Sequence, residues 1–285
     1  MSEVALIWMQ FALCIVLIGF AGVKLTRYGD VIAEKTGMGG AWIGLILMAM
    51  VTSLPELVTG VSAVTLAGTP DIAVGDALGS CVFNLGIIFI LDFLHRGESV
   101  YTRAHQGHIL SAGFGVILLG MAGANILIGE RLGHLAIGHV GIYTPVIMLL
   151  YLIAMRTVFF YERDKIRAAV EENVARYPDI SLKFAVQRYA AAALVVVAAG
   201  LWLPFVGKGL AVQMGWHESF VGTLLIAFVT SVPEMVVTVS ALRIGALDMA
   251  IGNLFGSNLF DVLILAVDDV FYLDGPILSH VSPPM

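Results

Sequence analysis

Three acidic side chains stand inside long apolar stretches of this sequence, where a charge is costly. They are Glu56 in "VTSLPE", Glu234 in "VTSVPE" and Asp261 in "GSNLFD". No Lys or Arg lies within the apolar stretches of these motifs. An uncompensated charge at the middle of a membrane costs at least about 2.5 kcal/mol. We therefore expect a bound cation or proton to compensate the three acids.

Each glutamate follows a proline that must open its helix and free backbone oxygen atoms. Pro55 has no N–H to donate to the carbonyl of Val51, and its ring crowds that turn. The helix is expected to open near Val51 and Thr52, and Glu56 lies one turn after Thr52 on the same face. The second motif repeats the arrangement with Thr230, Ser231, Pro233 and Glu234.

A second pair of motifs adds polar side chains to these acids. Ser80 and Asn84 are four residues apart, as are Ser257 and Asp261, so each pair lines one helix face. Oxygen ligands of this kind suit hard cations, since Ca²⁺ takes roughly 6 to 8 of them, whereas Zn²⁺ and copper favour imidazole or thiolate. Three carboxylates exceed the charge of one divalent ion, which indicates exchange against Na⁺ or H⁺.

The composition predicts an all-α integral membrane protein. Of the 285 residues, 59% are hydrophobic and 13% are charged, against about 25% charge in a soluble domain. Runs of roughly 20 apolar residues predict transmembrane helices. There are about eight of them, near 4–23, 39–67, 72–94, 107–128, 135–160, 185–207, 219–244 and 249–267. The net charge of -6 argues against a nucleic-acid partner.

The basic residues predict the orientation of these helices. With the N-terminus outside, 13 of the 15 Lys and Arg residues fall on one side, and only Arg131 and Lys208 fall on the other. Cytoplasmic loops carry the excess of Lys and Arg. We therefore expect a multi-pass protein of the plasma membrane, with its N-terminus outside and the linker 161–184 in the cytoplasm.

A duplicated block reveals an internal repeat. Residues 44–56 align with 222–234 at an offset of 178, and residues 75–84 align with 252–261 at an offset of 177. The copies lie five spans apart and so cross the membrane in opposite directions, an inverted repeat typical of secondary transporters. The expected domains are a first repeat of five helices (1–160), the linker (161–184) and a second repeat of three helices (185–285). Within the block, Gly75 with Gly79, and Gly252 with Gly256, have the spacing that lets helix backbones approach closely.

Through these motifs the sequence resembles the cation/Ca²⁺ exchanger superfamily, and within it the prokaryotic Na⁺/Ca²⁺ exchangers. The resemblance implies that Glu56 and Glu234 are the main Ca²⁺ carboxylates, assisted by the backbone carbonyls of Thr52 and Thr230. It implies alternating access, in which the helices near 4–23 and 185–207 slide across a core bundle. The Na⁺ sites that it implies use Ala49, Ser53, Ser80, Ala227, Ser231 and Ser257 with the two glutamates, and Asn84 and Asp261 complete the central site.

Two features depart from this family. Its members have ten helices, whereas this chain stops after the eighth, so the last two helices appear missing. They come from a partner chain or a second copy, or the sequence is a fragment, or the protein is degenerate. The second feature is Asp76, where the family usually has Asn, as at Asn253. We hypothesise an entrance carboxylate at Asp76 that binds a proton or an additional cation; the alternative is a partly solvated residue in the first helical turn.

The predicted function is a secondary antiporter that exchanges Ca²⁺ for Na⁺. One alternative is a Ca²⁺/H⁺ antiporter on the same scaffold, and another is a non-transporting membrane subunit. No nucleophile and base are arranged for covalent catalysis, so an enzyme is not expected. Ca²⁺ and Na⁺ are expected as transported ions, with the lipid bilayer as surroundings and no organic cofactor. Among the other acids, Asp268 and Asp269 are expected at a solvated helix end, and Asp71 and Asp248 as helix N-caps.

Overall fold

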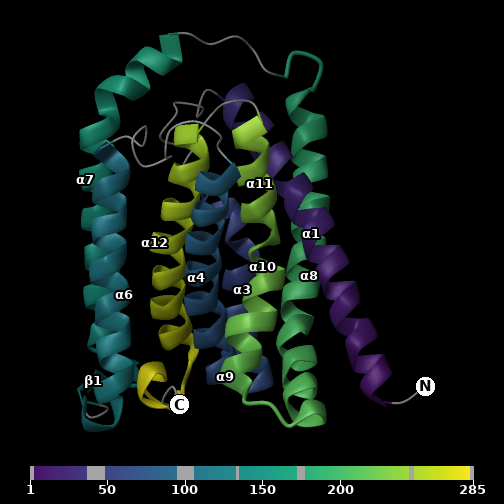
Figure 1. The fold of residues 1–285 in the computed structure, drawn as a ribbon, viewed down its shortest axis with the longest axis vertical. Coiled ribbons are helices and arrows are strands. Elements are labelled where there is room, and N and C mark those ends of the chain that lie inside the picture. Colours follow the sequence, from purple (N-terminus) through teal and green to yellow (C-terminus); the bar gives the residue numbers. More distant parts are fainter. Residues whose placement is uncertain are drawn as a thin grey trace.

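The chain folds into a bundle of long helices (Figure 1). The computed structural model describes residues 3–36, 49–94, 106–132, 135–171, 177–243 and 247–282. Within these residues, six helices are long and apolar enough to cross a membrane. They are α1 (Glu3–Lys35), α4 (Pro70–Leu94), α6 (Gln106–Leu132), α7 (Tyr143–Glu171), α8 (Leu182–Met214) and α12 (Leu247–Phe271).

A seventh span is a broken helix. It consists of α9 (Glu218–Phe220), the π-helical η2 (Val221–Ile226), α10 (Ala227–Thr230) and α11 (Val232–Arg243), and it bends by 45° at Ser231. Its counterpart in the first repeat is α3 (Leu54–Ser62) followed by the π-helical η1 (Ala63–Ala67). Residues 39–48 of the second predicted span lie outside the described residues. Seven of the eight predicted spans are thus recognised here, together with the second half of the remaining one.

One predicted span begins later than expected. Residues 136–141 form a small antiparallel hairpin of β1 (Ala136–Ile137) and β2 (Val140–Gly141), with Ala136 opposite Gly141. The turn is possible because Gly138 adopts a left-handed φ of 68°. The helix predicted from residue 135 therefore starts at Tyr143, and it continues past residue 160 to Glu171.

Asp269, near the end of α12, links this hairpin to the C-terminal segment through hydrogen bonds. Its carboxylate is fully buried and accepts hydrogen bonds from two side chains and two backbone amides. The donors are the hydroxyls of Tyr143 and Thr144 and the N–H groups of Gly141 and Ile277, the last of which opens the 3₁₀-helix η3 (Ile277–Ser279). The expectation that Asp269 lies at a solvated helix end is therefore wrong.

Corresponding helices of the two repeats run in opposite directions. In Figure 1, α4 rises from the lower end of the bundle whereas α12 descends to it, and α3 and α11 are opposed in the same way. The helix α12 is central, because 78% of its span is buried and it packs on α3, α4, α6, α7 and α11. By contrast, only 17% of the span of α6 is buried. This arrangement confirms the inverted repeat and places the polar motifs at the centre.

Candidate cation site

The two proline motifs interrupt their helices at equivalent residues. Ser53 (φ -84°, ψ 13°) and Ser231 (φ -80°, ψ 3°) leave helical geometry, and α3 and α11 restart beside them. The break falls one residue beyond the predicted opening at Thr52. Glu56 and Glu234 then lie in the first turns of the new helices, where the free N–H groups favour negative charge.

Each glutamate is contacted by a serine of its own repeat. Glu56 and Glu234 are each 1% exposed. The Ser80 hydroxyl on α4 donates to Glu56 Oε1 over 3.4 Å, and the Ser257 hydroxyl on α12 donates to Glu234 Oε1 over 3.5 Å. These two contacts are related by the repeat, so the duplicated sequence produces a duplicated half-site.

Further contacts join the two halves across the bundle. The Ser53 hydroxyl of the first repeat donates to Glu234 Oε1 over 3.1 Å, and Thr52 Oγ1 lies 3.3 Å from Ser257 Oγ. The reciprocal contact is not made, because the buried Ser231 hydroxyl has no hydrogen-bond partner. The site is therefore shared between the repeats but is not symmetric.

Asp261 and Asn84 lie against each other between α4 and α12. Asn84 Nδ2 donates to Asp261 Oδ2 over 3.4 Å and to Asn258 Oδ1 over 2.9 Å, and Cys81 Sγ lies 3.9 Å from Asp261 Oδ2. Sequence reasoning missed Asn258 and Cys81. The available signal was that they occupy equivalent positions of the two repeats, 177 residues apart.

Asp76 lies inside the bundle, beside the central residues. It is 1% exposed, and Thr230 Oγ1 donates to Asp76 Oδ1 over 2.8 Å. The alternative of a partly solvated residue in the first turn is therefore wrong. Its repeat counterpart, Asn253, is also fully buried, and neither amide atom of Asn253 has a partner.

The carbonyls of Ala49 and Ala227 are already engaged. Ala49 O accepts from Ser53 N over 3.0 Å and from Thr52 Oγ1 over 3.1 Å. Ala227 O accepts from Ser231 N over 3.0 Å and from Thr230 Oγ1 over 3.2 Å. Because a carbonyl has two lone pairs, a cation would reach either oxygen only if the threonine hydroxyl turned away.

Many buried oxygens in this region have no hydrogen-bond donor, although a buried unpaired polar group costs about 1–3 kcal/mol and a charged one costs more. Among the described residues, no Lys or Arg forms an ion pair with these acids. The oxygens in question are Glu56 Oε2, Asp76 Oδ2, Asn84 Oδ1, Ser231 Oγ, Glu234 Oε2 and Asp261 Oδ1. The arrangement leaves acceptors from both repeats free for a positively charged ligand.

No three of the described acids lie together closely enough to hold one metal ion on their own. Within the described part of the chain, no three His, Cys, Asp or Glu side chains form a group that could bind one ion. Serine and threonine hydroxyls or backbone carbonyls must therefore complete any coordination shell around Glu56 or Glu234. This requirement fits Na⁺ and Ca²⁺, which accept neutral oxygen ligands.

Comparison with known families identifies the motifs. A family model described as sodium/calcium exchanger protein matches residues 6–161 and 184–271. The inner membrane protein YrbG of Escherichia coli is 25% identical over 252 residues, which cover 88% of this chain and 75% of YrbG. The sodium/calcium exchanger MaX1 of Methanosarcina acetivorans is 47% identical over 60 residues, which cover 21% of this chain and 17% of MaX1.

Solved structures share the fold. The sodium-calcium exchanger NCX_Mj, soaked with Na⁺ and Sr²⁺, has a TM-score of 0.58 at 23% identity, covering 97% of this chain and 86% of NCX_Mj. The H⁺/Ca²⁺ exchanger CAX has a TM-score of 0.68 at 15% identity, covering 93% of this chain and 67% of CAX. These likenesses show a common helical architecture.

Proposed function

Because this chain belongs to the sodium/calcium exchanger family, we propose that it is a secondary antiporter that exchanges Ca²⁺ for Na⁺ across a membrane. The observation that carries the proposal is the set of buried acceptor oxygens without donors at the meeting of the two repeats. A cation is the ligand that such oxygens require. The strong local similarity to MaX1 supports Na⁺ as the exchanged ion.

In this proposal, Ca²⁺ is held between Glu56 and Glu234, with the carbonyls of Thr52 and Thr230. Asp261 and Asn84 complete the central site. Na⁺ ions share the glutamates and use the surrounding alanine carbonyls and serine hydroxyls, at Ala49, Ser53, Ser80, Ala227, Ser231 and Ser257. Since both ions need the same carboxylates, one must leave before the other binds, which is the condition for exchange.

Alternating access requires helices that can move across the site, and α1 and α8 are suited to this movement. They pack along each other. At Gly22, α1 crosses the proline motif of the second repeat, and at Gly200, α8 crosses α3 of the first repeat. A Cβ added at Gly22 would lie 3.1 Å from Pro233 Cβ, and one added at Gly200 would lie 2.9 Å from Val58 Cγ1. Gly22 and Gly200 are 178 residues apart, the offset of the repeat. The two crossings are thus equivalent in the repeats. Because neither glycine has a side chain that would catch on the helix it crosses, α1 and α8 would be able to slide together.

A Ca²⁺/H⁺ antiporter is the second candidate, favoured by the number of buried acids. Asp76 adds a fourth carboxylate beside Glu56, Glu234 and Asp261, and protons could balance this charge. The fold likeness to CAX accommodates that function. We further propose a plasma-membrane location with the N-terminus outside, on the strength of the Lys and Arg distribution.

Uptake of ⁴⁵Ca²⁺ into proteoliposomes tests the function directly. Vesicles carrying the 285-residue chain are given an outward Na⁺ gradient or an outward H⁺ gradient. Uptake driven by Na⁺, and abolished in both Glu56→Gln and Glu234→Gln, supports the proposal. Uptake driven only by H⁺ establishes the second candidate. Ca²⁺ binding without flux, from folded protein, refutes both and favours a non-transporting subunit.

A further inference from the structure

Asp268 is a fully buried acid that the proposed cation site does not use. It lies near the end of α12 and is 0% exposed, so the expectation of a solvated helix end is wrong here too. Neither carboxylate oxygen has a hydrogen-bond donor. This sets it apart from Asp269, the next residue, whose carboxylate accepts four hydrogen bonds.

The carboxylate of Asp268 rests on a glycine of α3. A Cβ added at Gly60 would overlap both Asp268 oxygens, at 2.8 Å from Oδ1. Gly60 is four residues beyond Glu56 and so lies one turn along the same helix face. Asp268 is seven residues beyond Asp261, about 10 Å farther along α12 at 1.5 Å per residue. The Asp268–Gly60 contact therefore lies between the cation site and the end of the bundle where α12 ends.

The repeat supplies an internal comparison for this position. At the offset of 177, the counterpart of Asp268 is Leu91 on α4. Leu91 is 1% exposed and packs in an apolar cluster with Ile87, Ile88 and Leu254. The fold thus accepts an apolar side chain at the equivalent position of the first repeat, so the shared architecture does not itself require an acid there.

Among the described residues, no positively charged group acts on Asp268. The charged groups that act on it are Asp76 on α4 and Asp269 on its own helix, both acidic. Tyr143 on α7 directs its hydroxyl to Asp269, and α3 contributes the uncharged Gly60. A carboxylate anion in this setting would lack both donors and a counter-charge.

We propose that Asp268 is a proton-binding site between α3 and α12, separate from the cation site. A proton is the occupant that the surroundings allow, because it converts the group to a neutral acid and needs no further ligand. A metal ion would need several oxygen ligands. Unlike Glu56 and Glu234, the Asp268 carboxylate has no serine or threonine hydroxyl of the described residues within hydrogen-bond distance that could complete such a shell. Release of the proton leaves a carboxylate anion that needs water, and water can reach it only if the contact of Asp268 with Gly60 opens. Alkaline medium therefore favours separation of α3 and α12 at this contact.

Infrared spectroscopy of the purified protein in lipid vesicles tests this site without any transport assay. At pH 7 the wild-type spectrum is expected to contain a C=O stretching band from the protonated Asp268 carboxyl group. The band is expected to lose the amplitude of one carboxyl group in Asp268→Asn, and to fade in the wild type as the pH is raised. Asp248→Asn is the matched control on the same helix, because the Asp248 side chain is 66% exposed and its loss should leave the band unchanged.

A second variant guards against a folding defect. Asp268→Leu introduces the residue that occupies the equivalent position in the first repeat, so helix packing should accept it. An unchanged carboxyl band in either folded variant would show that Asp268 is ionised and would overturn the proposal. Because the measurement needs neither Ca²⁺ nor a gradient, its failure is distinguishable from failure of the proposed exchange.

Discussion

Replacing Gly79 by alanine should force α4 away from the broken helix. A Cβ at this position would lie 2.7 Å from Ala227 Cβ and 2.8 Å from Thr223 Cα, whereas ordinary contacts begin at 3.4 Å. The helices must therefore separate by at least about 0.7 Å, because Thr223 O lies nearer still. Backbone atoms cannot turn aside as the end of a flexible side chain can. Overpacking of this kind costs about 1–3 kcal/mol, and we expect the upper end of that range because two of the obstructing atoms belong to the backbone.

The repeat supplies the matched control for this substitution. Gly256 is the counterpart of Gly79, but among the described residues, which leave out 37–48, a Cβ there would meet only Ala49 Cβ, at 3.2 Å. A shift of a few tenths of an ångström relieves that contact, so Gly256→Ala should lower the free energy of unfolding by less than about 1 kcal/mol. The free energies of unfolding are compared in mixed micelles by titration with a denaturing detergent, monitored by circular dichroism. Equal losses in the two variants would refute the argument from close packing.

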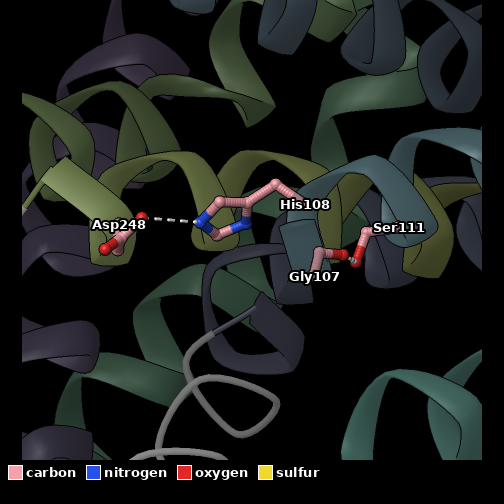
Figure 2. Close-up of polar contacts among 4 residues, drawn as sticks. All are labelled: Gly107, His108, Ser111 and Asp248. Atoms are coloured by element: carbon pink, nitrogen blue, oxygen red, sulfur yellow. Dashed lines mark hydrogen bonds and ion pairs between the residues drawn. The ribbon is translucent and has the colours of Figure 1, made fainter. Parts of the chain in front are cut away.

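Three further predictions concern buried or paired acids. Asp269→Asn should lower the free energy of unfolding by about 3 kcal/mol, because a buried charge that accepts four hydrogen bonds is replaced; an unchanged melting temperature would contradict this. The His108–Asp248 contact, 3.1 Å long and shown in Figure 2, joins α6 to α12. Since the Asp248 side chain is 66% exposed, Asp248→Asn should cost less than about 1 kcal/mol in the same detergent titration, and a larger loss would contradict a solvent-screened pair. Asp76→Asn keeps an oxygen for the Thr230 hydroxyl but removes a charge, so Ca²⁺ binding should weaken about tenfold, or about 1.4 kcal/mol, by isothermal titration calorimetry, and unchanged affinity would remove Asp76 from the site.

The sequence was sufficient to predict the features that each repeat encodes locally. A proline removes a backbone hydrogen bond and crowds the preceding turn, and the breaks at Ser53 and Ser231 lie within one residue of the opening predicted on that ground. Four-residue spacing places Ser80 and Asn84 on one face of α4, and in the structure both contact a central acid, Ser80 contacting Glu56 and Asn84 contacting Asp261. These outcomes depend on backbone geometry, which sequence spacing describes well.

Contacts between the repeats were beyond such reasoning. Ser53 contacts a glutamate of the other repeat whereas Ser231 does not, and Thr230 donates its hydrogen bond to Asp76. Both outcomes depend on how two helices rotate against each other. The polar run that contains Asp268 and Asp269 suggested a solvated end, because hydropathy cannot foresee that residues near 141 and 277 return to cover it. Helix rotation and chain return are tertiary properties, and no local pattern specifies them.

The differences between the repeats make the two ends of the cation path unequal in charge. The first turns of α4 and the last turns of α12 meet at one end of the bundle (Figure 1), and that end contains Asp76 and Asp268. The equivalent positions toward the other end are the neutral Asn253 and Leu91. Gradients alone set the direction of net exchange, so this asymmetry acts only on the affinities of the two faces. Asp76 and Asp268 are the two acids at this end that have neutral counterparts at the other end. While Asp268 holds its proton, only Asp76 of these two can attract a cation. Alkaline medium at that end should therefore strengthen cation capture from that face and leave capture from the other face unaltered.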